Sequence, residues 1–249
     1  MAGRSTRSLA VFPIVPPFIA TSSRQLLDEL AAIDISVPLR TEGRTTEHTE
    51  RWSTCRFLAT YATTDLLTYP LKVVPRDRPD VLVTLASATR GIEITEAVPT
   101  DWAKIGALYE HRDYENLMHT PRFVPGEAPR PATELNRIAC GDDPGPAWAG
   151  DSPEREWASA MHYFVRQKVE KLSKPGFGRY DQDWLLIYDN WPVPAINEAL
   201  AASYLSEQLA SSSPTIPFHA VFVECYRHFW HFQDGAATGT EINDIWKDS

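Results

Sequence analysis

The sequence predicts an α/β protein, a three-layer sandwich in which a central mixed β-sheet lies between two layers of helices. Segments whose apolar residues recur every three or four positions alternate along the chain with short runs of β-branched and aromatic residues. Two of these runs are joined by a turn of small residues, which favours antiparallel pairing. The run 184–188 has no charged or amide residue, which is typical of a central strand that is covered on both faces.

The N-terminal part is expected to contain an extended segment and two helices. The apolar stretch 9–20 follows two arginines, as a secretory leader does, but its three prolines favour an extended segment that packs on the protein. A short amphipathic helix is predicted over 22–33. A polar stretch, 41–49, leads into a second helix, and Glu47 and Glu50 lie at or just before its start, where carboxylates suit the helix dipole. The inner face of this second helix is predicted to carry Trp52, Cys55, Phe57, Leu58 and Tyr61.

Strands follow in the middle of the chain. We expect them at 71–74, 80–85 and 91–95, and the last two are expected to pair antiparallel across the turn 86–90. The segment 102–117 is then expected to contain a helix.

A proline- and glycine-rich excursion, 121–153, lacks clear periodicity and interrupts the core. A strong helix is predicted from Pro153 to about residue 173, capped by Asp151 or Ser152. The later elements are a strand at 184–188, a helix at 196–209 and a strand at 220–226, which 229–232 extends or returns. The polar tail 234–249 is expected to be loosely held. We therefore predict a single domain over 1–249 with its core at about 45–230.

Composition narrows the classes of function. The 249 residues are 43% apolar and carry 24 basic against 33 acidic side chains, a net charge of −9 that argues against a uniformly basic protein but leaves room for a local basic groove. No stretch reaches the roughly 18 consecutive apolar residues of a membrane helix, so no membrane partner is expected. The three cysteines form no CxxC pair, which argues against a zinc ribbon or disulfide framework and favours a reducing cytoplasm. The sequence also lacks the phosphate-loop, dinucleotide, nucleophile-elbow and HExxH motifs.

The strongest indication of chemistry is a pair of acids, Asp80 and Glu93, on the two strands expected to be antiparallel. Adjacent strands lie about 4.8 Å apart, so an acid at the start of one can face an acid on the next. Two carboxylates that close repel each other unless a cation lies between them, and Mg²⁺ or Mn²⁺ prefers such oxygen ligands. Thr95 shares the side of the strand that carries Glu93. The simpler interpretation is that Asp80 caps a turn and Glu93 is solvated.

Lys168 lies in the apolar stripe of the long helix, where a buried ammonium costs free energy unless an anion meets it. An acidic metal site is one such partner, and the alternative is that the side chain extends along the helix to water. Arg166, Lys171, Lys174 and Arg179 form a locally basic strip around it, which suits contacts with phosphates.

These residues resemble the motifs of the PD-(D/E)XK nuclease superfamily. The resemblance is carried by a Pro-Asp pair within 78–83, a glutamate within 91–97, and the segment 165–172 that leads to the strand at 183–188. It covers roughly 47–226 apart from the excursion, and it implies an αβββαβ, restriction-endonuclease-like core. Members usually carry a lysine two residues after the glutamate, where this sequence has Thr95. Some members place that lysine on the following helix, which would make Lys168 the replacement.

The resemblance implies metal-dependent hydrolysis of a phosphodiester. Asp80 and Glu93 would hold Mg²⁺ or Mn²⁺ together with the backbone carbonyl of Ile94. A glutamate of the first core helix, Glu47 or Glu50, would join them, and our preferred candidate for this metal ligand is Glu50.

Under the same resemblance, Lys168 would orient the attacking water or stabilise charge on the phosphate, and Thr95 would hydrogen-bond the water. The chain would be a nuclease with nucleic acid as its partner, and a restriction or defence enzyme is one candidate type. One alternative is an inactive nuclease-like fold that acts as an interaction or scaffold module. Another is a small-molecule enzyme on a different α/β sheet. The choice between DNA and RNA, and between monomer and homodimer, stays open.

Overall fold

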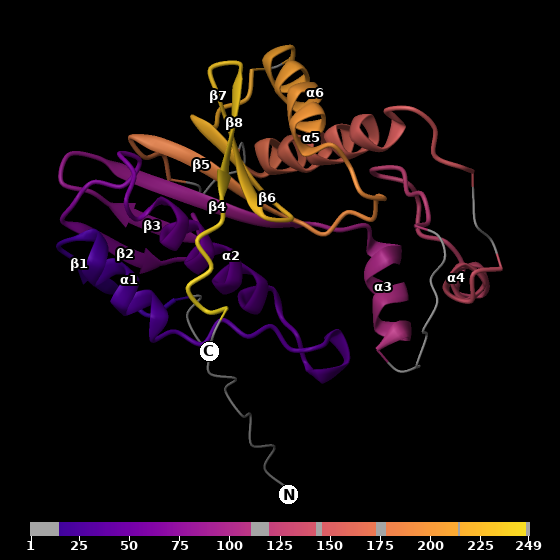
Figure 1. The fold of residues 1–249 in the computed structure, drawn as a ribbon, viewed down its shortest axis with the longest axis horizontal. Coiled ribbons are helices and arrows are strands. Elements are labelled where there is room, and N and C mark those ends of the chain that lie inside the picture. The colour runs from indigo at the N-terminus through magenta and orange to yellow at the C-terminus, as the bar shows by residue number, and fades with distance from the viewer. Residues whose placement is uncertain (1–14, 111–119, 143–145, 173–177, 214, 248–249) are drawn as a thin grey trace, which may run out of the picture.

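The computed structural model describes residues 15–110, 120–142, 146–172, 178–213 and 215–247. Within them, eight strands form one mixed sheet whose spatial order follows the chain (Figure 1). The strands are β1 (Phe18–Ala20), β2 (Leu71–Pro75), β3 (Val81–Thr84), β4 (Thr89–Ala97), β5 (Gln182–Asp189), β6 (Ala220–Cys225), β7 (His228–Gln233) and β8 (Ala236–Glu241). Strand β5 pairs parallel with both β4 and β6, and the other neighbours pair antiparallel.

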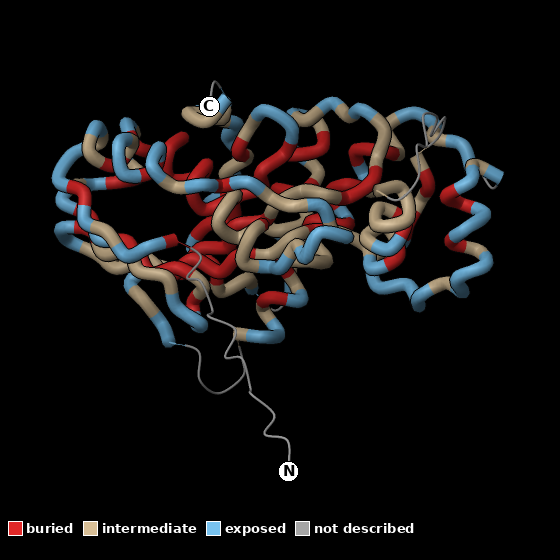
Figure 2. Tube along the Cα trace, turned by 90° about the horizontal axis from the view of Figure 1, so that it is seen from below, coloured by how far each residue is buried: buried red, intermediate tan, exposed pale blue. Residues whose placement is uncertain are grey.

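Helices cover both faces of this sheet. They are α1 (Ser23–Ala31), α2 (Thr46–Tyr61), α3 (Thr100–Tyr109), α4 (Ala132–Ala139), α5 (Ser152–Leu172) and α6 (Glu198–Ala210), with a short 3₁₀ turn, η1, at Arg40–Glu42. Helices α1 and α2 share one apolar core with the sheet, and α3 to α6 share a second core on the opposite face. Figure 2 shows these buried residues concentrated between the layers. The predicted α/β class with a mixed sheet is confirmed. None of the described helices is long and apolar enough to cross a membrane.

Alternation along the central strands explains how one sheet serves two cores. In β5, Trp184 and Leu186 pack in the core beneath α2, whereas Leu185 and Ile187 pack in the core beneath α5 and α6. Successive strand residues point to opposite faces, so a strand without polar interruption must be covered twice. The predicted central position of this strand is confirmed by its two parallel neighbours.

The excursion 121–153 contains a helix that the sequence analysis did not expect. Helix α4 has only eight residues and buries Leu135, Ile138 and Ala139. The helix has little more than two turns and lies between prolines, so its apolar periodicity is too short to be distinguished from a loop. The helix expected within 102–117 is observed as α3, and residues 111–119 lie outside the described part of the chain.

The expectation of a loosely held C-terminal tail is wrong. Strand β8 extends the sheet beyond β7, and Ile242, Ile245 and Trp246 pack against the core beneath α2. The indole of Trp246 donates a hydrogen bond to the carbonyl of Ile33 at 3.1 Å. With β1 at the other edge, the sheet extends past both ends of the predicted core. The small and polar residues of β8 carry little apolar periodicity, so its strand conformation depends on pairing with β7.

A buried charge network ties the C-terminal segment to the sheet. Glu224 of β6 accepts hydrogen bonds from the guanidinium of Arg56 at 2.8 Å and from the indole of Trp52 at 3.2 Å. Arg56 also contacts Asp244 at 2.6 Å. Burial raises the pKa of Glu224, and the positive charge of Arg56 opposes that shift. Arg56 therefore links α2, β6 and the C-terminal segment through one guanidinium.

Replacing Arg56 by Met should lower the free energy of unfolding by about 3–5 kcal/mol near pH 7, because the Glu224 carboxylate would stay buried without its cation. Urea denaturation followed by circular dichroism measures this loss. The matched control is Arg155→Met, which removes the exposed pair between Arg155 and Asp151 (side-chain exposures 60% and 41%) and should cause a much smaller loss, because water screens this pair. Equal losses in the two variants would contradict the role given to the buried network.

Candidate active site

Two strands and one helix bring Asp80, Glu93 and Lys168 together. In the antiparallel register of β3 and β4, Val81 pairs with Ile92, so Asp80 lies just before β3 and beside Glu93. Ile92 and Ile94 point into the core beneath α2, and strand alternation therefore directs Glu93 toward the opposite face, where α5 crosses.

The ammonium of Lys168 lies between the two acids. Its Nζ atom is 3.0 Å from Oε2 of Glu93 and 3.6 Å from Oδ2 of Asp80. The same Asp80 oxygen accepts a hydrogen bond from the backbone N–H of Ile94 at 2.6 Å. Lys168 is 8% exposed and Glu93 is 6% exposed. The structure thus excludes both simpler interpretations, a solvated Glu93 and a Lys168 that extends to water.

Burial dominates the electrostatics of these acids. Desolvation raises the pKa of Asp80, and the nearby Lys168 charge opposes the shift. The pKa of Glu93 is raised by desolvation and then by the negative charge of Asp80. Oxygen Oε1 of Glu93 is buried and has no hydrogen-bond partner among the described residues. One ammonium therefore compensates two carboxylates, and one buried acceptor is left over.

Of the two glutamates considered at the start of α2, Glu50 is the one whose pKa responds to the charges of the site. Burial raises the pKa of Glu50 to about 7, the negative charges of Asp80, Glu47 and Glu93 raise it further, and the positive charge of Lys168 opposes the shift. Glu47 responds to different neighbours, because a hydrogen bond with the Thr45 side chain lowers its pKa. Which glutamate turns inward depends on the rotation of α2 against the sheet, and the sequence does not determine that rotation.

The donor set fits a hard divalent cation in its chemistry. Asp80 and Glu93 offer carboxylate oxygens, which Mg²⁺ and Mn²⁺ prefer, and Oε1 of Glu93 still lacks a partner. In the described part of the chain, however, no group of three or more acidic, histidine or cysteine side chains is arranged to hold a metal. The position expected for the ion, between the two acids, is held by the Lys168 ammonium.

The other predicted residues are distributed around this centre. Thr95, half-buried, lies two residues beyond Glu93 on the same side of β4. Lys171 is exposed, and its charge acts on Glu93. Arg166 instead acts on His162, one turn back along α5. Lys174 lies outside the described residues.

Arg179, the remaining member of the basic strip, is already engaged. Its Nε atom contacts Oδ2 of Asp183 at 2.8 Å. Lys171 of the basic strip is a described residue whose charge acts on Glu93.

Gly91 is a site-shaping residue that the sequence analysis missed. A Cβ atom at this position would lie 2.5 Å from Cδ2 of Tyr180 and 3.2 Å from Cγ of Pro79. The Tyr180 ring therefore lies directly over the β4 backbone, two residues before Glu93. A glycine inside a strand often marks such a close approach, which was the available signal.

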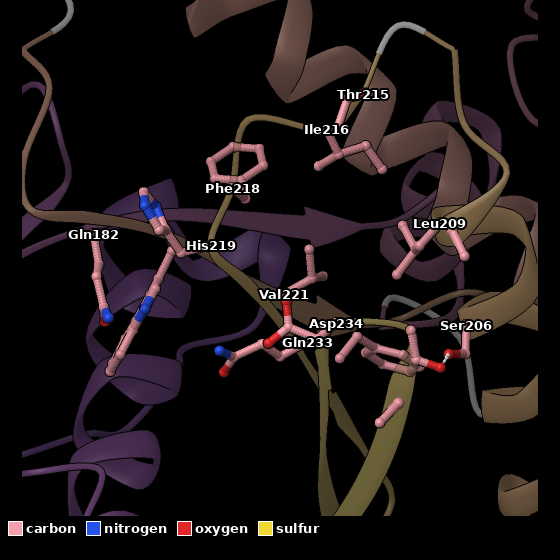
Figure 3. Close-up of a pocket in the computed structure, with 15 residues that line it drawn as sticks. Gln182, Ser206, Leu209, Thr215, Ile216, Phe218, His219, Val221, Gln233 and Asp234 are labelled. Carbon is pink, nitrogen blue, oxygen red and sulfur yellow. Dashed lines mark hydrogen bonds between the residues drawn. The ribbon is translucent and has the colours of Figure 1, made fainter.

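A separate hollow is lined by residues of β5 to β8, of α6 and of the segment before β6 (Figure 3). It encloses about 360 Å³ and extends from Gln182 and His219 at one end to Ser206 at the other. Its lining contains none of the three converging residues. Nδ1 of His219 accepts a hydrogen bond from the backbone N–H of Asp183 at 3.0 Å, and the Ser206 hydroxyl donates to the Gly235 carbonyl at 2.9 Å. These polar groups support the local fold.

Replacing Glu50 by Gln should change how stability depends on pH. A carboxyl group whose pKa rises from 4.5 to about 7 on folding contributes stability that is complete below pH 4.5 and lost as the pH rises through 7. The variant lacks this loss, so its free energy of unfolding should gain on the parent by about 2–3 kcal/mol between those values. Urea titrations at several pH values measure the difference. Glu47→Gln is the matched control and should show no such gain, and parallel profiles for parent and Glu50→Gln would contradict the assignment.

Comparison with known proteins adds no relative from which this geometry could be interpreted. No family model, no curated protein and no solved structure matches the chain. The convergence of Asp80, Glu93 and Lys168 is therefore the basis for any functional conclusion.

Proposed function

We propose that the chain is a metal-dependent nuclease that hydrolyses phosphodiester bonds in nucleic acid. The observation that carries this proposal is the convergence of Asp80, Glu93 and Lys168 from three separate elements at one buried point. Buried acids with raised pKa values gathered beside a lysine support the proposal, because such perturbed groups cluster at functional sites. The proposal includes the restriction-endonuclease-like core, which the order α2, β2–β4, α5, β5 supports.

In this proposal Asp80 and Glu93 hold Mg²⁺ or Mn²⁺, and Glu50 is the third acidic ligand. The bound ion would lower the pKa of a water molecule and polarise the phosphate. Oε1 of Glu93 supports this role, because a buried carboxylate oxygen without a partner is costly unless a cation meets it. Burial of the acids in a largely dry site strengthens their attraction for such an ion.

Lys168 supplies the positive charge that the transition state needs. Its ammonium is held at the acids and is placed to stabilise negative charge that develops on the phosphate oxygens, a role commonly worth a few kcal/mol. Thr95 can hydrogen-bond the attacking water from the same side of β4, and Lys171 can contact a neighbouring phosphate. With a net charge of −9 for the whole chain, we expect such phosphate contacts to be confined to this local strip. We also propose a cytoplasmic location, because three cysteines without a CxxC pair favour a reducing compartment.

Asp80→Asn and Glu93→Gln should each lower nuclease activity by at least about 100-fold, because each removes a charge that holds the ion. The assay incubates single- and double-stranded DNA and RNA with Mn²⁺ and follows the fragments by electrophoresis. Glu96→Gln is the matched control on the same strand. Its side chain points to the other face, where Arg40, Arg44 and Asn190 bind it. Cleavage that survives both acid substitutions at parental rate would reject the proposal.

Lys168→Met should abolish most cleavage, and Thr95→Lys in that background should restore part of it. A lysine at position 95 would lie on the side of β4 that carries Glu93, so its ammonium could replace the one lost from α5. We expect a loss of about 100-fold or more and a recovery of about tenfold. Thr95→Lys in the parent is the control for damage by the new charge. A double variant no more active than Lys168→Met would contradict the idea that the helix lysine replaces the strand lysine.

One observation favours an inactive module as the second candidate. The Lys168 ammonium already satisfies Asp80 and Glu93 in the position expected for the ion, so the fold could be complete without metal. Titration of the chain with Mn²⁺ by calorimetry separates the two functions. Binding that depends on Glu93 supports the nuclease, and the absence of specific binding supports the module.

A further inference from the structure

We propose that a hollow beside the candidate active site binds one nucleobase of the substrate strand. The hollow encloses about 320 Å³ between α5, the start of α3 and the segment 123–129. Its walls include four aromatic rings, those of Phe123, Tyr163, Phe164 and Trp191. The inference rests on the proposed function, because the base belongs to the strand whose phosphate would reach Lys168.

The hollow is continuous with the catalytic elements. Gln167 lines it and immediately precedes Lys168 on α5, and Phe164 lies one helical turn before Lys168. On the sheet side, β4 carries Glu93 and leads directly into Val98, which also lines the hollow. Three residues of extended chain from Thr95 to Val98 cover about 10 Å. A strand with its phosphate at the acids would therefore reach the hollow with a base one or two nucleotides away.

The shape of the aromatic wall suits a flat ring. Phe164 meets Trp191 with ring centroids 6.1 Å apart and Tyr163 with centroids 5.6 Å apart, both edge to face. Phe123 and Trp191 are buried, whereas Tyr163 and Phe164 are half-buried and so present part of each ring to the hollow. Every nucleobase has a π-face, so stacking on such rings tolerates any sequence.

The charge of the hollow favours a base over a phosphate. None of the residues that line it within the described ranges is Lys or Arg, and its two acidic side chains are Asp101 and Glu127. Both acids are compensated from outside the lining, Asp101 by Lys104 at 3.0 Å and Glu127 by Arg130 at 3.0 Å. The lining itself offers no cation to bind a phosphate, and the guanidinium of Arg130, which lies over the Phe123 ring at 4.8 Å, is paired with Glu127. Gln167, whose amide nitrogen donates to the Tyr163 hydroxyl at 2.7 Å, adds an amide at the rim that can hydrogen-bond a base edge.

The test uses single-stranded DNA oligonucleotides with 2-aminopurine at successive positions, in EDTA so that binding is separated from cleavage. Stacking should quench the fluorescence strongly at one position. Phe164→Leu removes a ring but keeps an apolar side chain, and it should weaken binding about 5- to 20-fold. Tyr204→Leu is the matched control, since this ring lies over Arg155 outside the hollow. Equal affinities for the two variants would overturn the proposal.

A second pair of variants changes exposed side chains, so a loss of core packing cannot explain their effects. Val124 lines the hollow and is 64% exposed, and Ile19 on the edge strand β1 is 56% exposed. Val124→Glu should weaken the oligonucleotide and abolish the position-specific quenching, whereas Ile19→Glu should change neither. Quenching that persists in Val124→Glu would assign the base to another surface and reject the hollow. The hollow would also be rejected as a nucleobase site if an apolar peptide displaced the labelled oligonucleotide and an unlabelled oligonucleotide did not.

The outcomes also separate this inference from the nuclease proposal. If the chain binds the oligonucleotide through Phe164 but never cleaves with Mn²⁺, the nucleobase site stands and the hydrolytic proposal fails. If cleavage depends on Asp80 while Phe164→Leu and Tyr204→Leu behave alike, the nuclease stands and the nucleobase site is wrong.

Discussion

The ammonium of Lys168 between two buried carboxylates is the interaction on which the rest of this face of the molecule depends. Each acid alone would be costly to bury, and together they would repel each other across neighbouring strands. Lys168 reduces both costs at once because it is itself almost fully buried on α5. That contact requires α5 to cross β4 at Glu93, and it requires β3 to begin exactly beside that crossing. The register of two strands and the position of a helix are thus coupled through one charge.

The balance of charge at this centre is incomplete. One ammonium faces two acids, and a third acid, Glu50, has a pKa raised to about 7, so it is about half ionised near neutral pH. Ionisation of Glu50 therefore adds negative charge to the surroundings of Asp80 and Glu93 as the pH rises. Oε1 of Glu93 has no hydrogen-bond partner among the described residues.

The two faces of the sheet differ in how their charged groups are paired. Beneath α2, arginines pair with acids of the chain itself: Arg56 binds Glu224, and Arg40 and Arg44 both bind Glu96 at 2.9 and 3.0 Å. These contacts hold the segment before α2 and the C-terminal segment against the sheet. Beneath α5 the polar groups converge on a centre that is under-compensated, and the aromatic hollow opens beside it.

Periodicity alone was enough to predict the strands β2 to β6, the long helix α5 and the placement of Lys168 on its buried stripe, because alternation and helical spacing are local properties of the chain. The pairing of Asp80 with Glu93 followed from the antiparallel connection of their strands. The choice of Glu50 over Glu47 could not be made from sequence, because it depends on how α2 is rotated against the sheet. Strand β8 and helix α4 escaped prediction because short or small-residue segments acquire their structure from the partners they meet. That an ammonium lies where an ion was expected, and that four aromatic rings from distant segments enclose a hollow beside it, was decided only by the packing of α5 between the sheet and the excursion.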